Sequence, residues 1–402
     1  MVNTIVIIND FGLINGGVGK IAISSSRSLA EKGYHIVYFC AVNPIDNLLI
    51  HPNIKIICTG QYDILNDPKR LRAAFQGLWN IKARKEFKKI LNNLSPETTI
   101  IHYHGWIKAL SPSIFSIKKL QNFKIYITLH DFFTYCPNGG LYIYPSNKIC
   151  KFKPMSIQCI MCNCDSRSYM QKIWRTIRQS IQSHLLKKLS HITYISISDL
   201  TQKLFLANFP FKYKELIRIN NPIDQPLITN TDNSPKDLYL FMARLSSEKG
   251  INLFCQSIRE SNVKGCVIGD GYLLEEFKNK YPEIIFTGWL NNEEKIPYLK
   301  RTKFFVFPSI WYETFGLVVA EMLSNGIPCI TSDTCAAKEL IKENKTGFIF
   351  KNGSINSLKD IIKKAENTDY KSISSCIQDS FSIEEYSMDN HIKKLISTYN
   401  QN

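Results

Sequence analysis

Two glutamates eight positions apart, Glu313 and Glu321, form the most distinctive pattern in the chain. If the segment between them is helical, they lie about 12 Å apart along the helix axis. Their carboxylates then cannot share one ligand atom, but they can flank an elongated ligand. We expect residues 314–317 to form the first turn of this helix, whose free N–H groups favour an anion such as a diphosphate. The alternative is a pair of solvated helix charges.

Two cations, Arg244 and Lys249, follow the apolar core of the segment DLYLFMARL. Open α/β sheets bind ligands just past the carboxyl ends of their strands. Cations at such a place can neutralise a diphosphate and stabilise charge that develops on a leaving group. The alternative for Lys249 is a surface lysine before Gly250. Gly269 follows another apolar run, where it either lets the backbone approach a nucleotide or simply forms a tight turn.

A glycine-rich turn and a histidine follow apolar runs in the first half of the chain. Gly16 and Gly17 begin the sequence GGVGK, which lacks both the P-loop spacing and the Ser or Thr after its lysine, so ATP hydrolysis is excluded. We expect these glycines to lie at the floor of an interdomain cleft, close to a ligand. His130 ends the run FKIYITLH, where a structural histidine is the alternative. His104 is expected to be structural or to support the cleft from beneath.

Five of the twelve cysteines lie between positions 136 and 164. Cys159 and Cys162 form a C-x2-C knuckle, and Cys136 and Cys150 can complete a tetrahedral Zn(Cys)4 site. Cys164 is then spare. We expect zinc in a structural role, stapling a loop beside the cleft. Free thiols are the main alternative, and disulfides are a weaker one. An iron–sulfur cluster is a further alternative, although no redox-partner motif accompanies it.

The order of apolar runs predicts two α/β domains. Strand-like runs alternate with helical patterns in both halves, as in buried parallel sheets. We expect an N-terminal domain at 1–225 with a Cys-rich insertion at 136–164, and a C-terminal domain at 226–382. A polar linker is expected at 228–237. The final helix, 383–402, is expected to pack back toward the N-terminal domain.

The net charge of +16 favours an anionic partner. Zinc-finger, RRM and helix-turn-helix signatures are absent from the sequence, which argues against nucleic acid. The sequence also has no apolar run long enough for a transmembrane helix and no signal peptide. We expect the segment 167–189 to be an amphipathic helix. Its apolar stripe would pack on the N-terminal sheet, and its basic face would contact anionic lipid head groups.

Taken together, these motifs resemble the retaining GT-B glycosyltransferases of family 4 (glycosyl transferases group 1), of the type that builds bacterial surface polysaccharides. The resemblance spans nearly the whole chain and rests on order and spacing, since most of the motifs are weak alone. The residues that carry it are Gly16-Gly17-Val18-Gly19-Lys20, His130-Asp131, Asn221-Pro222-Ile223-Asp224, Arg244-Leu245 with Lys249-Gly250, Gly269-Asp270-Gly271, and Glu313-Thr314-Phe315-Gly316-Leu317 with Glu321.

The resemblance implies an α/β GT-B fold, with two Rossmann-like domains that face each other across a cleft. It implies that His130 contacts the donor sugar beside the anomeric carbon, that Glu313 binds the sugar hydroxyls and that Glu321 binds the ribose. The catalytic residues are then His130, Arg244, Lys249 and Glu313. The donor-binding residues are Gly16, Gly17, Gly269, Phe315, Gly316, Leu317 and Glu321.

We therefore expect a cytoplasmic enzyme, peripheral on the inner face of the cell membrane, that transfers a hexose from a UDP- or GDP-linked donor to a glycan or lipid-linked acceptor. No carboxylate in the N-terminal motifs is clearly placed as a nucleophile, so we expect front-face displacement and not a covalent intermediate. No catalytic metal is expected. The alternatives are a sugar-nucleotide 2-epimerase of the same fold and a non-catalytic glycan- or nucleotide-binding scaffold.

Overall fold

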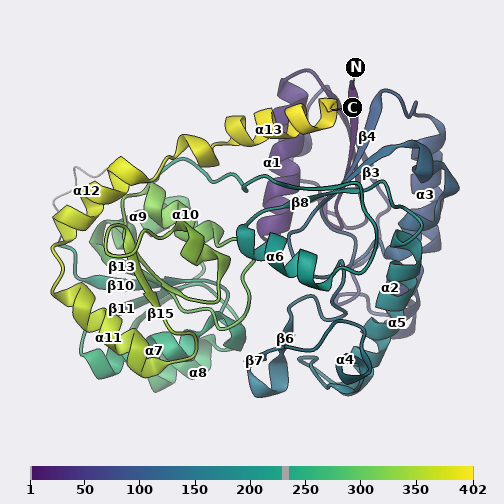
Figure 1. The fold of residues 1–402 in the computed structure, drawn as a ribbon. Coiled ribbons are helices and arrows are strands. Elements are labelled where there is room, and N and C mark those ends of the chain that lie inside the picture. The colour runs from purple at the N-terminus through teal and green to yellow at the C-terminus, as the bar shows by residue number, and fades with distance from the viewer. Residues whose placement is uncertain (1, 229–234, 402) are drawn as a thin grey trace. The chain divides into compact units, whose positions relative to one another are not determined.

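The computed structural model describes residues 2–228 and 235–401, which form two compact units, each with its own parallel sheet (Figure 1). Unit 1 comprises residues 1–140, 152–222 and 388–402, and unit 2 comprises 141–151 and 223–387. The predicted linker at 228–237 falls largely on 229–234, outside the described residues. Among the described helices, none is both long and apolar enough to cross a membrane.

Unit 1 contains a seven-stranded sheet in the order β3-β2-β1-β4-β5-β8-β9, and every pair of neighbours is parallel. Its strands are β1 (Thr4–Ile8), β2 (His35–Cys40), β3 (Ile54–Cys58), β4 (Thr99–Tyr103), β5 (Lys124–Thr128), β8 (Thr193–Ser196) and β9 (Glu215–Arg218). Its helices are α1 (Gly17–Glu31), α2 (Arg70–Leu78), α3 (Ile81–Asn92), α4 (Ile157–Met161), α5 (Tyr169–Leu186), α6 (Asp199–Asn208) and α13 (Met388–Asn400).

Unit 2 contains a six-stranded parallel sheet in the order β12-β11-β10-β13-β14-β15. Its strands are β10 (Leu238–Met242), β11 (Lys264–Ile268), β12 (Ile285–Gly288), β13 (Thr302–Phe307), β14 (Cys329–Ser332) and β15 (Gly347–Phe350). Its helices are α7 (Ile251–Ser261), α8 (Leu274–Lys280), α9 (Asn292–Arg301), α10 (Leu317–Ser324), α11 (Ile355–Glu366) and α12 (Tyr370–Ser380). A two-stranded antiparallel hairpin of β6 (Tyr142–Ile143) and β7 (Lys148–Ile149) is grouped with this unit.

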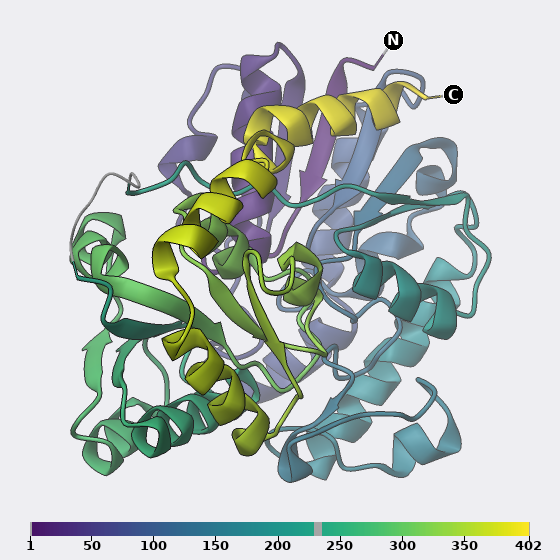
Figure 2. The same cartoon turned by 60° about the vertical axis from the view of Figure 1, so that its left-hand side comes forward.

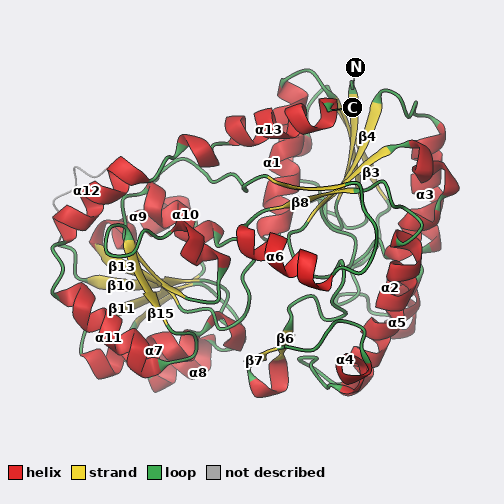
Figure 3. Cartoon of the chain, in the orientation of Figure 1, coloured by secondary structure: helices red, strands yellow, loops and turns green. Residues whose placement is uncertain are grey.

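Strand β10 shows why these runs form central strands. Its side chains alternate between two hydrophobic clusters, with Leu238 and Leu240 in one and Tyr239 and Phe241 in the other. A strand that is buried on both faces needs apolar residues at successive positions, which is the pattern of the sequence. Figure 3 shows helices on both faces of the sheet in each unit. The expected α/β class is confirmed.

The last helix, α13, packs against α1 within unit 1, and Figure 2 shows the two helices lying together. Ile392, Leu395 and Tyr399 enter the apolar cluster that includes the first strand. The Tyr399 hydroxyl lies 2.6 Å from His102 Nδ1, and His102 Nε2 lies 2.8 Å from Thr128 Oγ1. Burial lowers the pKa of His102 well below its ordinary value, so the imidazole is neutral. The end of the chain thereby completes the core of the first sheet.

The boundaries differ in three places from those expected. The division between the units lies between Pro222 and Ile223, and residues 383–387 are grouped with unit 2. The sequence places the whole Cys-rich segment in the N-terminal domain, whereas residues 141–151 are grouped with unit 2. Contacts made by the hairpin decide this grouping, and no local sequence pattern reports such contacts.

The prediction that segment 167–189 presents a basic face is wrong for Lys172, Arg175 and Arg178, whereas Lys187 and Lys188 are exposed. On α5, the Lys172 and Arg178 side chains are buried, and Arg175 Nε lies 2.7 Å from Asp165 Oδ2. Ile177, a member of the predicted apolar stripe, is 48% exposed. Several cations of this helix therefore face the interior of unit 1, where they have their own partners, and do not form an outer charged face.

We predict that Tyr399→Phe lowers the free energy of unfolding by about 1–3 kcal/mol, because a fully buried nitrogen of His102 loses its partner. Tyr399→Ala also removes a buried ring and should cost about 3–5 kcal/mol. Urea unfolding of the full chain measures both values. Tyr34→Phe, at a partly exposed tyrosine of the same unit, serves as the control. Equal midpoints for wild type and Tyr399→Phe would show that the hydroxyl contributes nothing.

Candidate functional site

In unit 2 the candidate site lies where the strand order reverses. The first strand of the sheet, β10, is flanked by β11 and β13, because the chain first extends the sheet to one side and then crosses to the other. Open α/β sheets bind ligands at this switch point, outside the carboxyl ends of the strands. The segments that follow these three strands contain Arg244 and Lys249, Gly269, and Glu313 respectively. The fold therefore brings three of the predicted motifs to adjacent strand ends.

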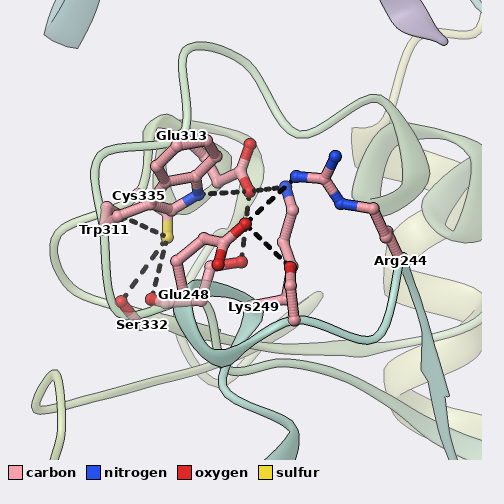
Figure 4. Close-up of polar contacts among 9 residues, drawn as sticks. Arg244, Glu248, Lys249, Trp311, Glu313, Ser332 and Cys335 are labelled. Carbon is pink, nitrogen blue, oxygen red and sulfur yellow. Dashed lines mark hydrogen bonds and ion pairs between the residues drawn. The ribbon is translucent and has the colours of Figure 1, made fainter. Parts of the chain in front are cut away.

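Glu313 and Lys249 form an ion pair between two of these loops (Figure 4). The side chains are only 14% and 18% exposed. Trp311 Nε1 donates to Glu313 Oε1 at 2.7 Å, and Ser309 Oγ donates to the same oxygen at 3.2 Å. The Lys249 ammonium also lies 5.0 Å from the centre of the Trp311 ring. Three donors thus converge on one carboxylate oxygen, and Figure 4 shows the other oxygen pointing away from them.

The charge of Glu313 is stabilised locally. Burial opposes its ionisation, but Lys249, Trp311 and Ser309 together hold the pKa of this carboxyl below its ordinary value. Glu313 is therefore an anion at neutral pH, and it fixes the position of the ammonium beside it. The sequence does not predict this rigid pair, because the two residues belong to separate motifs.

Arg244 has a different environment. Its side chain is 67% exposed, and its Nη2 lies 3.1 Å from Oε1 of the buried Glu248. Ser246 Oγ donates to the same Glu248 oxygen at 2.7 Å. The carboxylate anchors one edge of the guanidinium and leaves the rest of the group in solvent. Sequence reasoning missed Glu248, although its position between Arg244 and Lys249 was a usable signal.

Two glycines allow the loops to approach each other closely. Gly250 has φ 77°, and a Cβ there would lie 2.0 Å from the carbonyl oxygen of Pro308. Gly269 has φ 143°, and a Cβ there would lie 2.0 Å from the carbonyl oxygen of Ala243. A larger residue at Gly250 would push the loop after β13 away from the loop that carries Lys249. A larger residue at Gly269 would push the loop after β11 away from the loop that carries Arg244. These glycines are needed for packing of the loops.

The helix after Glu313 starts later than expected. Helix α10 begins at Leu317 with Gly316 as its N-cap, so residues 314–316 precede the helix and do not form its first turn. Val319 and Ala320 donate their N–H groups to Gly316 O at 2.9 and 3.2 Å. Glu321 lies on the second turn and is partly buried. The prediction of a continuous helix from Glu313 to Glu321 is wrong, because Gly316 takes a left-handed conformation.

Phe315 is 5% exposed, and its ring centre lies 6.1 Å from that of Tyr386. Backbone contacts also tie the loop to its surroundings, since Ala336 N donates to Glu313 O at 3.0 Å. The Cys335 thiol points at the carbonyls of Ser309 and Trp311, at 3.4 and 3.7 Å (Figure 4). The loop is therefore held from several sides before any ligand binds.

Unit 1 has a pocket at its own switch point, where β1 is flanked by β2 and β4. The pocket encloses about 620 Å³, including its open mouth. It is bordered by the segments that follow β1, β4 and β5 and by the start of α1. Its lining residues are Asn9, Asp10, Phe11, Asn15, Val18, Gly19, His104, Gly105, Trp106, Ile107, Lys108, Thr128, Asp131, Phe133 and Thr134.

Two carboxylates of this pocket differ in their surroundings. Asp10 is buried and accepts hydrogen bonds from the backbone N–H groups of Lys108, Ala109 and Leu110, each at 2.8 Å. Burial raises the pKa of Asp10, while these three bonds oppose that rise. Within the described residues Asp131 accepts only the Phe133 N–H, at 2.9 Å, and burial raises its pKa to about 6. Asp10 thus braces the loop after β4, while Asp131 lines the pocket with fewer internal bonds.

His130 and His104 lie one above the other beside the pocket. His104 Nδ1 lies 2.9 Å from His130 Nε2. Burial lowers the pKa of His130 to about 3 and that of His104 well below its ordinary value, so both rings are neutral. His104 Nε2 is buried and has no hydrogen-bond partner within the described residues. His104, expected to be structural, therefore lines the pocket and supports His130.

The predicted glycines of unit 1 lie at the start of α1. Gly16 is the N-cap of this helix and Gly17 its first residue. The pocket lining contains the next two residues of the helix, Val18 and Gly19, together with Asn15. Sequence reasoning missed Asp10, Asp131, Trp106 and Lys108 as pocket residues. Asp131 belongs to the His-Asp motif, and its carboxyl group was the available signal.

The Cys-rich segment surrounds a buried lysine. Lys172 Nζ, on α5, lies 3.4 Å from Cys159 Sγ. Burial opposes the charge of Lys172, but Cys164, Cys159 and Cys136 raise its pKa. Burial raises the pKa of Cys164 to about 11. Among the described residues, no three His, Cys, Asp or Glu side chains are grouped so as to hold a metal ion. Cys150 lies in the part grouped with unit 2.

With this geometry established, comparison with known proteins places the fold. Sucrose-phosphate synthase from Thermosynechococcus elongatus superposes with a TM-score of 0.70 at 18% identity, over 99% of this chain and 98% of that one. Anabaena HepE in complex with UDP gives a TM-score of 0.67 at 15% identity, over 98% and 99%. The protein has the α/β fold of the GT-B glycosyltransferases, with two parallel sheets.

At the sequence level, residues 228–380 match the family model "Glycosyl transferases group 1". A GDP-mannose-dependent alpha-mannosyltransferase of Corynebacterium glutamicum is 30% identical over 114 residues, which are 28% of this chain and 27% of that protein. The UDP-Gal:alpha-D-GlcNAc-diphosphoundecaprenol alpha-1,3-galactosyltransferase of Escherichia coli is 33% identical over 98 residues, 23% of this chain and 24% of that protein.

Two uncharacterised proteins from the cps region of Klebsiella pneumoniae match over 35% and 64% of their lengths, at 27% and 23% identity. The chain thus spans less than two thirds of these curated relatives. The matched family segment contains the Lys249–Glu313 pair and the start of α10. The candidate site of unit 2 therefore coincides with the part of the chain that is similar to group 1 glycosyltransferases.

We predict strong energetic coupling between Lys249 and Glu313. Lys249→Met alone leaves a buried carboxylate without its cation and should cost about 3–5 kcal/mol of unfolding free energy. Lys249→Met combined with Glu313→Gln should cost much less than the sum of the two single changes. Since the pair lowers the pKa of Glu313, its contribution is complete above about pH 4.5 and is lost as the pH falls through the lower folded-state pKa.

A double-mutant cycle in urea at neutral pH measures this coupling. Arg259→Met, Glu283→Gln and their double variant provide a matched control, because this ion pair in the same unit is 45% and 42% exposed. Its coupling should be below about 1 kcal/mol. Additive effects at Lys249 and Glu313, within about 0.5 kcal/mol, would contradict the buried pair.

Proposed function

We propose that the protein is a retaining glycosyltransferase that moves a hexose from a nucleotide-sugar donor to a glycan or lipid-linked acceptor in surface polysaccharide synthesis. The observation that carries this proposal is the Lys249–Glu313–Trp311 cluster at the switch point of unit 2, inside the segment similar to group 1 glycosyltransferases. An immobilised ammonium at this place suits the diphosphate of a nucleotide sugar. The named activities of the two curated enzymes above, which use GDP-mannose and UDP-Gal, support the substrate class.

The proposed chemistry begins at the leaving group. As the glycosidic bond breaks, negative charge grows on the diphosphate, and Lys249 and Arg244 stabilise it. Lys249 is already oriented by Glu313, so little reorganisation is needed when the charge develops. The N–H groups at the start of α10, after Phe315 and Gly316, add a positive dipole end. We retain front-face displacement, in which the leaving phosphate helps to remove the proton of the acceptor hydroxyl.

Two glutamates have separate roles in this proposal. The second oxygen of Glu313 points away from Lys249, so it can accept hydrogen bonds from hydroxyls of the donor sugar. Glu321, on the second turn of α10, binds the ribose hydroxyls. Gly269 and Leu317 contribute backbone groups to the nucleotide site. Gly16 and Gly17 remain proposed as close neighbours of the donor diphosphate or of the acceptor.

For the acceptor we propose the pocket of unit 1. Trp106 and Phe133 contribute aromatic side chains to its lining, and Asp131 contributes a carboxylate. Such a mixture of aromatic walls and few polar groups suits a hydroxyl-rich ligand. His130 is neutral and pairs with His104 of the pocket lining, and we propose that it contacts the donor sugar beside the anomeric carbon. An enzyme with a lipid-linked acceptor would act at the inner face of the cell membrane.

We predict that Lys249→Ala lowers turnover about 100- to 1000-fold while the donor dissociation constant changes little, because the ammonium acts mainly on charge formed in the transition state. Glu321→Ala should do the reverse and weaken nucleotide binding about 10- to 100-fold, through loss of a charge-assisted hydrogen bond. Turnover assays and calorimetry measure the two quantities, and circular dichroism checks that each variant is folded.

The experiment starts from a panel of UDP- and GDP-sugars, each tested for thermal stabilisation of the protein. The stabilising donor is then incubated alone and with candidate acceptors. Transfer or hydrolysis supports the proposal, isomerisation of the donor supports the epimerase, and binding without turnover supports the scaffold. Near-normal turnover of folded Lys249→Ala would contradict its assignment to the leaving group.

We also propose a structural zinc ion in the Cys-rich segment, with Cys136, Cys159 and Cys162 as ligands. Cys150 is the fourth ligand expected from the sequence, but the described residues show no group of three such side chains around a metal position, so the proposal rests on the C-x2-C knuckle. The position of Cys164 beside Lys172 makes it the competing fourth thiol. Four thiolates around Zn²⁺ carry two net negative charges, and the buried Lys172 ammonium would offset one of them. This charge balance gives a reason for a lysine among thiols.

For the zinc site we predict near one equivalent of metal in protein purified without chelator, measured by elemental analysis. Cys150→Ser should lose the metal, and Cys164→Ser should keep it. The opposite result would move the fourth ligand to Cys164. Absence of metal from the wild-type protein, with all twelve thiols titrating in denaturant, would favour free thiols.

A further inference from the structure

Unit 1 exposes large apolar side chains on adjoining helices. On α2, Leu71 and Phe75 are 78% and 72% exposed, and Ile81 at the start of α3 is 72% exposed. On α4, Ile157 and Met161 are 76% and 71% exposed, and Met170 near the start of α5 is 72% exposed. We call these six residues the apolar helix surface. Single exposed apolar residues are ordinary, but a gathering of this size marks an interaction site.

The packing of α2 shows that its apolar residues are not needed in the core. The opposite side of the helix, with Ala73 and Gly77, is buried. Trp174 of α5 packs on it, with its Nε1 donating to Ala74 O at 3.1 Å, and a Cβ at Gly77 would lie 2.6 Å from the indole ring. Leu71 and Phe75 are one turn apart and lie two positions from these contacts, so they project away from α5.

The second group of exposed apolar residues, on α4, is attached to α5, the helix that also packs against α2. Ile157 and Met161 are one turn apart on α4, and the buried Cys159 lies on the other side of that helix. The Tyr169 hydroxyl donates to Ile160 O at 3.2 Å and so attaches the start of α5 to α4. Met170 is one turn before Trp174, on the same side of α5. The contacts of α5 with both α2 and α4 thus connect the two apolar groups (Figure 1).

The charges around this surface are mostly positive. Residues 62–92 and 152–178 contain thirteen Lys or Arg and four Asp or Glu. Three of the four acids, Asp63, Asp67 and Asp165, are buried. The charged side-chain groups of the exposed Lys69, Lys85 and Lys88 on one side, and of Lys153 and Arg167 on the other, form no ion pair with a carboxylate within the described residues. The surface therefore presents apolar side chains with unpaired cations beside them.

We propose that the apolar helix surface docks on a lipid bilayer that contains anionic head groups. The six side chains would enter the boundary between head groups and acyl chains, while the neighbouring lysines and arginine would contact lipid phosphates. A second copy of the chain would bring the same cations together, and nucleic acid would leave the aliphatic side chains without apolar contacts. The docking rests on the proposed function in one respect, namely that a lipid-linked acceptor is reached at the membrane.

The test measures co-sedimentation of the full chain with vesicles. Wild type should bind vesicles of equal parts phosphatidylglycerol and phosphatidylcholine, bind pure phosphatidylcholine at least tenfold more weakly, and release progressively as salt is added. Leu71→Glu with Phe75→Glu should lower binding to the mixed vesicles by tenfold or more, since two apolar contacts are lost and two like charges are added. Ile157→Glu with Met161→Glu should act in the same direction.

Leu206→Glu, on α6 of the same unit, is the matched control, because its side chain is 58% exposed and lies outside the proposed surface. It should bind vesicles like the wild type. Circular dichroism and urea midpoints establish that all variants are folded. The proposal would be overturned if the wild type did not bind the mixed vesicles or bound neutral vesicles equally well. It would also be overturned if both double variants bound as strongly as the wild type.

Two further measurements, of oligomeric state and of donor hydrolysis, distinguish membrane docking from dimerisation and from loss of activity. Sedimentation that shows a wild-type dimer, converted to monomer by Leu71→Glu with Phe75→Glu, would assign the surface to a second copy and overturn membrane docking. Donor hydrolysis in solution, without vesicles, should be unchanged in both double variants. Vesicle binding without any turnover would leave the docking intact and contradict the proposed enzyme, whereas turnover without vesicle binding would do the opposite.

Discussion

Each sheet of this protein grows in both directions from its first strand, and the location of the candidate sites depends on this constraint. Both β1 and β10 are flanked by strands that come later in the chain. Where the strand order reverses, beside β1 and beside β10, the loops that follow neighbouring strands run to opposite sides of the sheet. Their backbone therefore leaves space at the carboxyl ends of these strands. The unit 1 pocket and the Lys249–Glu313 pair both lie at such points, although they use different residues.

Buried polar groups then give each site a defined geometry. Asp10 accepts three backbone N–H groups and fixes the loop after β4, and Glu313 accepts three side-chain donors and fixes Lys249. In a low-dielectric interior an unpaired charge is costly, so such groups are stable only with their full set of partners. A site held in this way can present charge to a ligand without first reorganising.

The same principle explains the inward-facing cations of α5. Lys172 lies among thiols, and Arg175 pairs with the buried Asp165. With these cations occupied, the large apolar side chains of unit 1 that are more than 70% exposed belong, among the described residues, to α2, α3, α4 and the first turn of α5. Site chemistry and surface chemistry are therefore separated within unit 1: the polar interior orders the loops, and the outer helices carry the most exposed apolar side chains.

Much of this could be predicted from the sequence, because local patterns report local constraints. Continuous apolar runs such as DLYLFMARL identified central parallel strands, and a cation or acid shortly after such a run was correctly placed at a strand end.

Only the tertiary structure determined which side chains pair with one another. The pairing of Lys249 with Glu313, of Asp10 with the β4 loop, and of Lys172 with Cys159 joins residues that are 64, about 100 and 13 positions apart. Helical periodicity likewise predicted an amphipathic α5, yet it could not tell which face would be buried, since that depends on the thiols and the carboxylate that the fold brings there. Side-chain burial and ion pairing are properties of the assembled layers, whereas secondary structure depends mainly on neighbours in the chain.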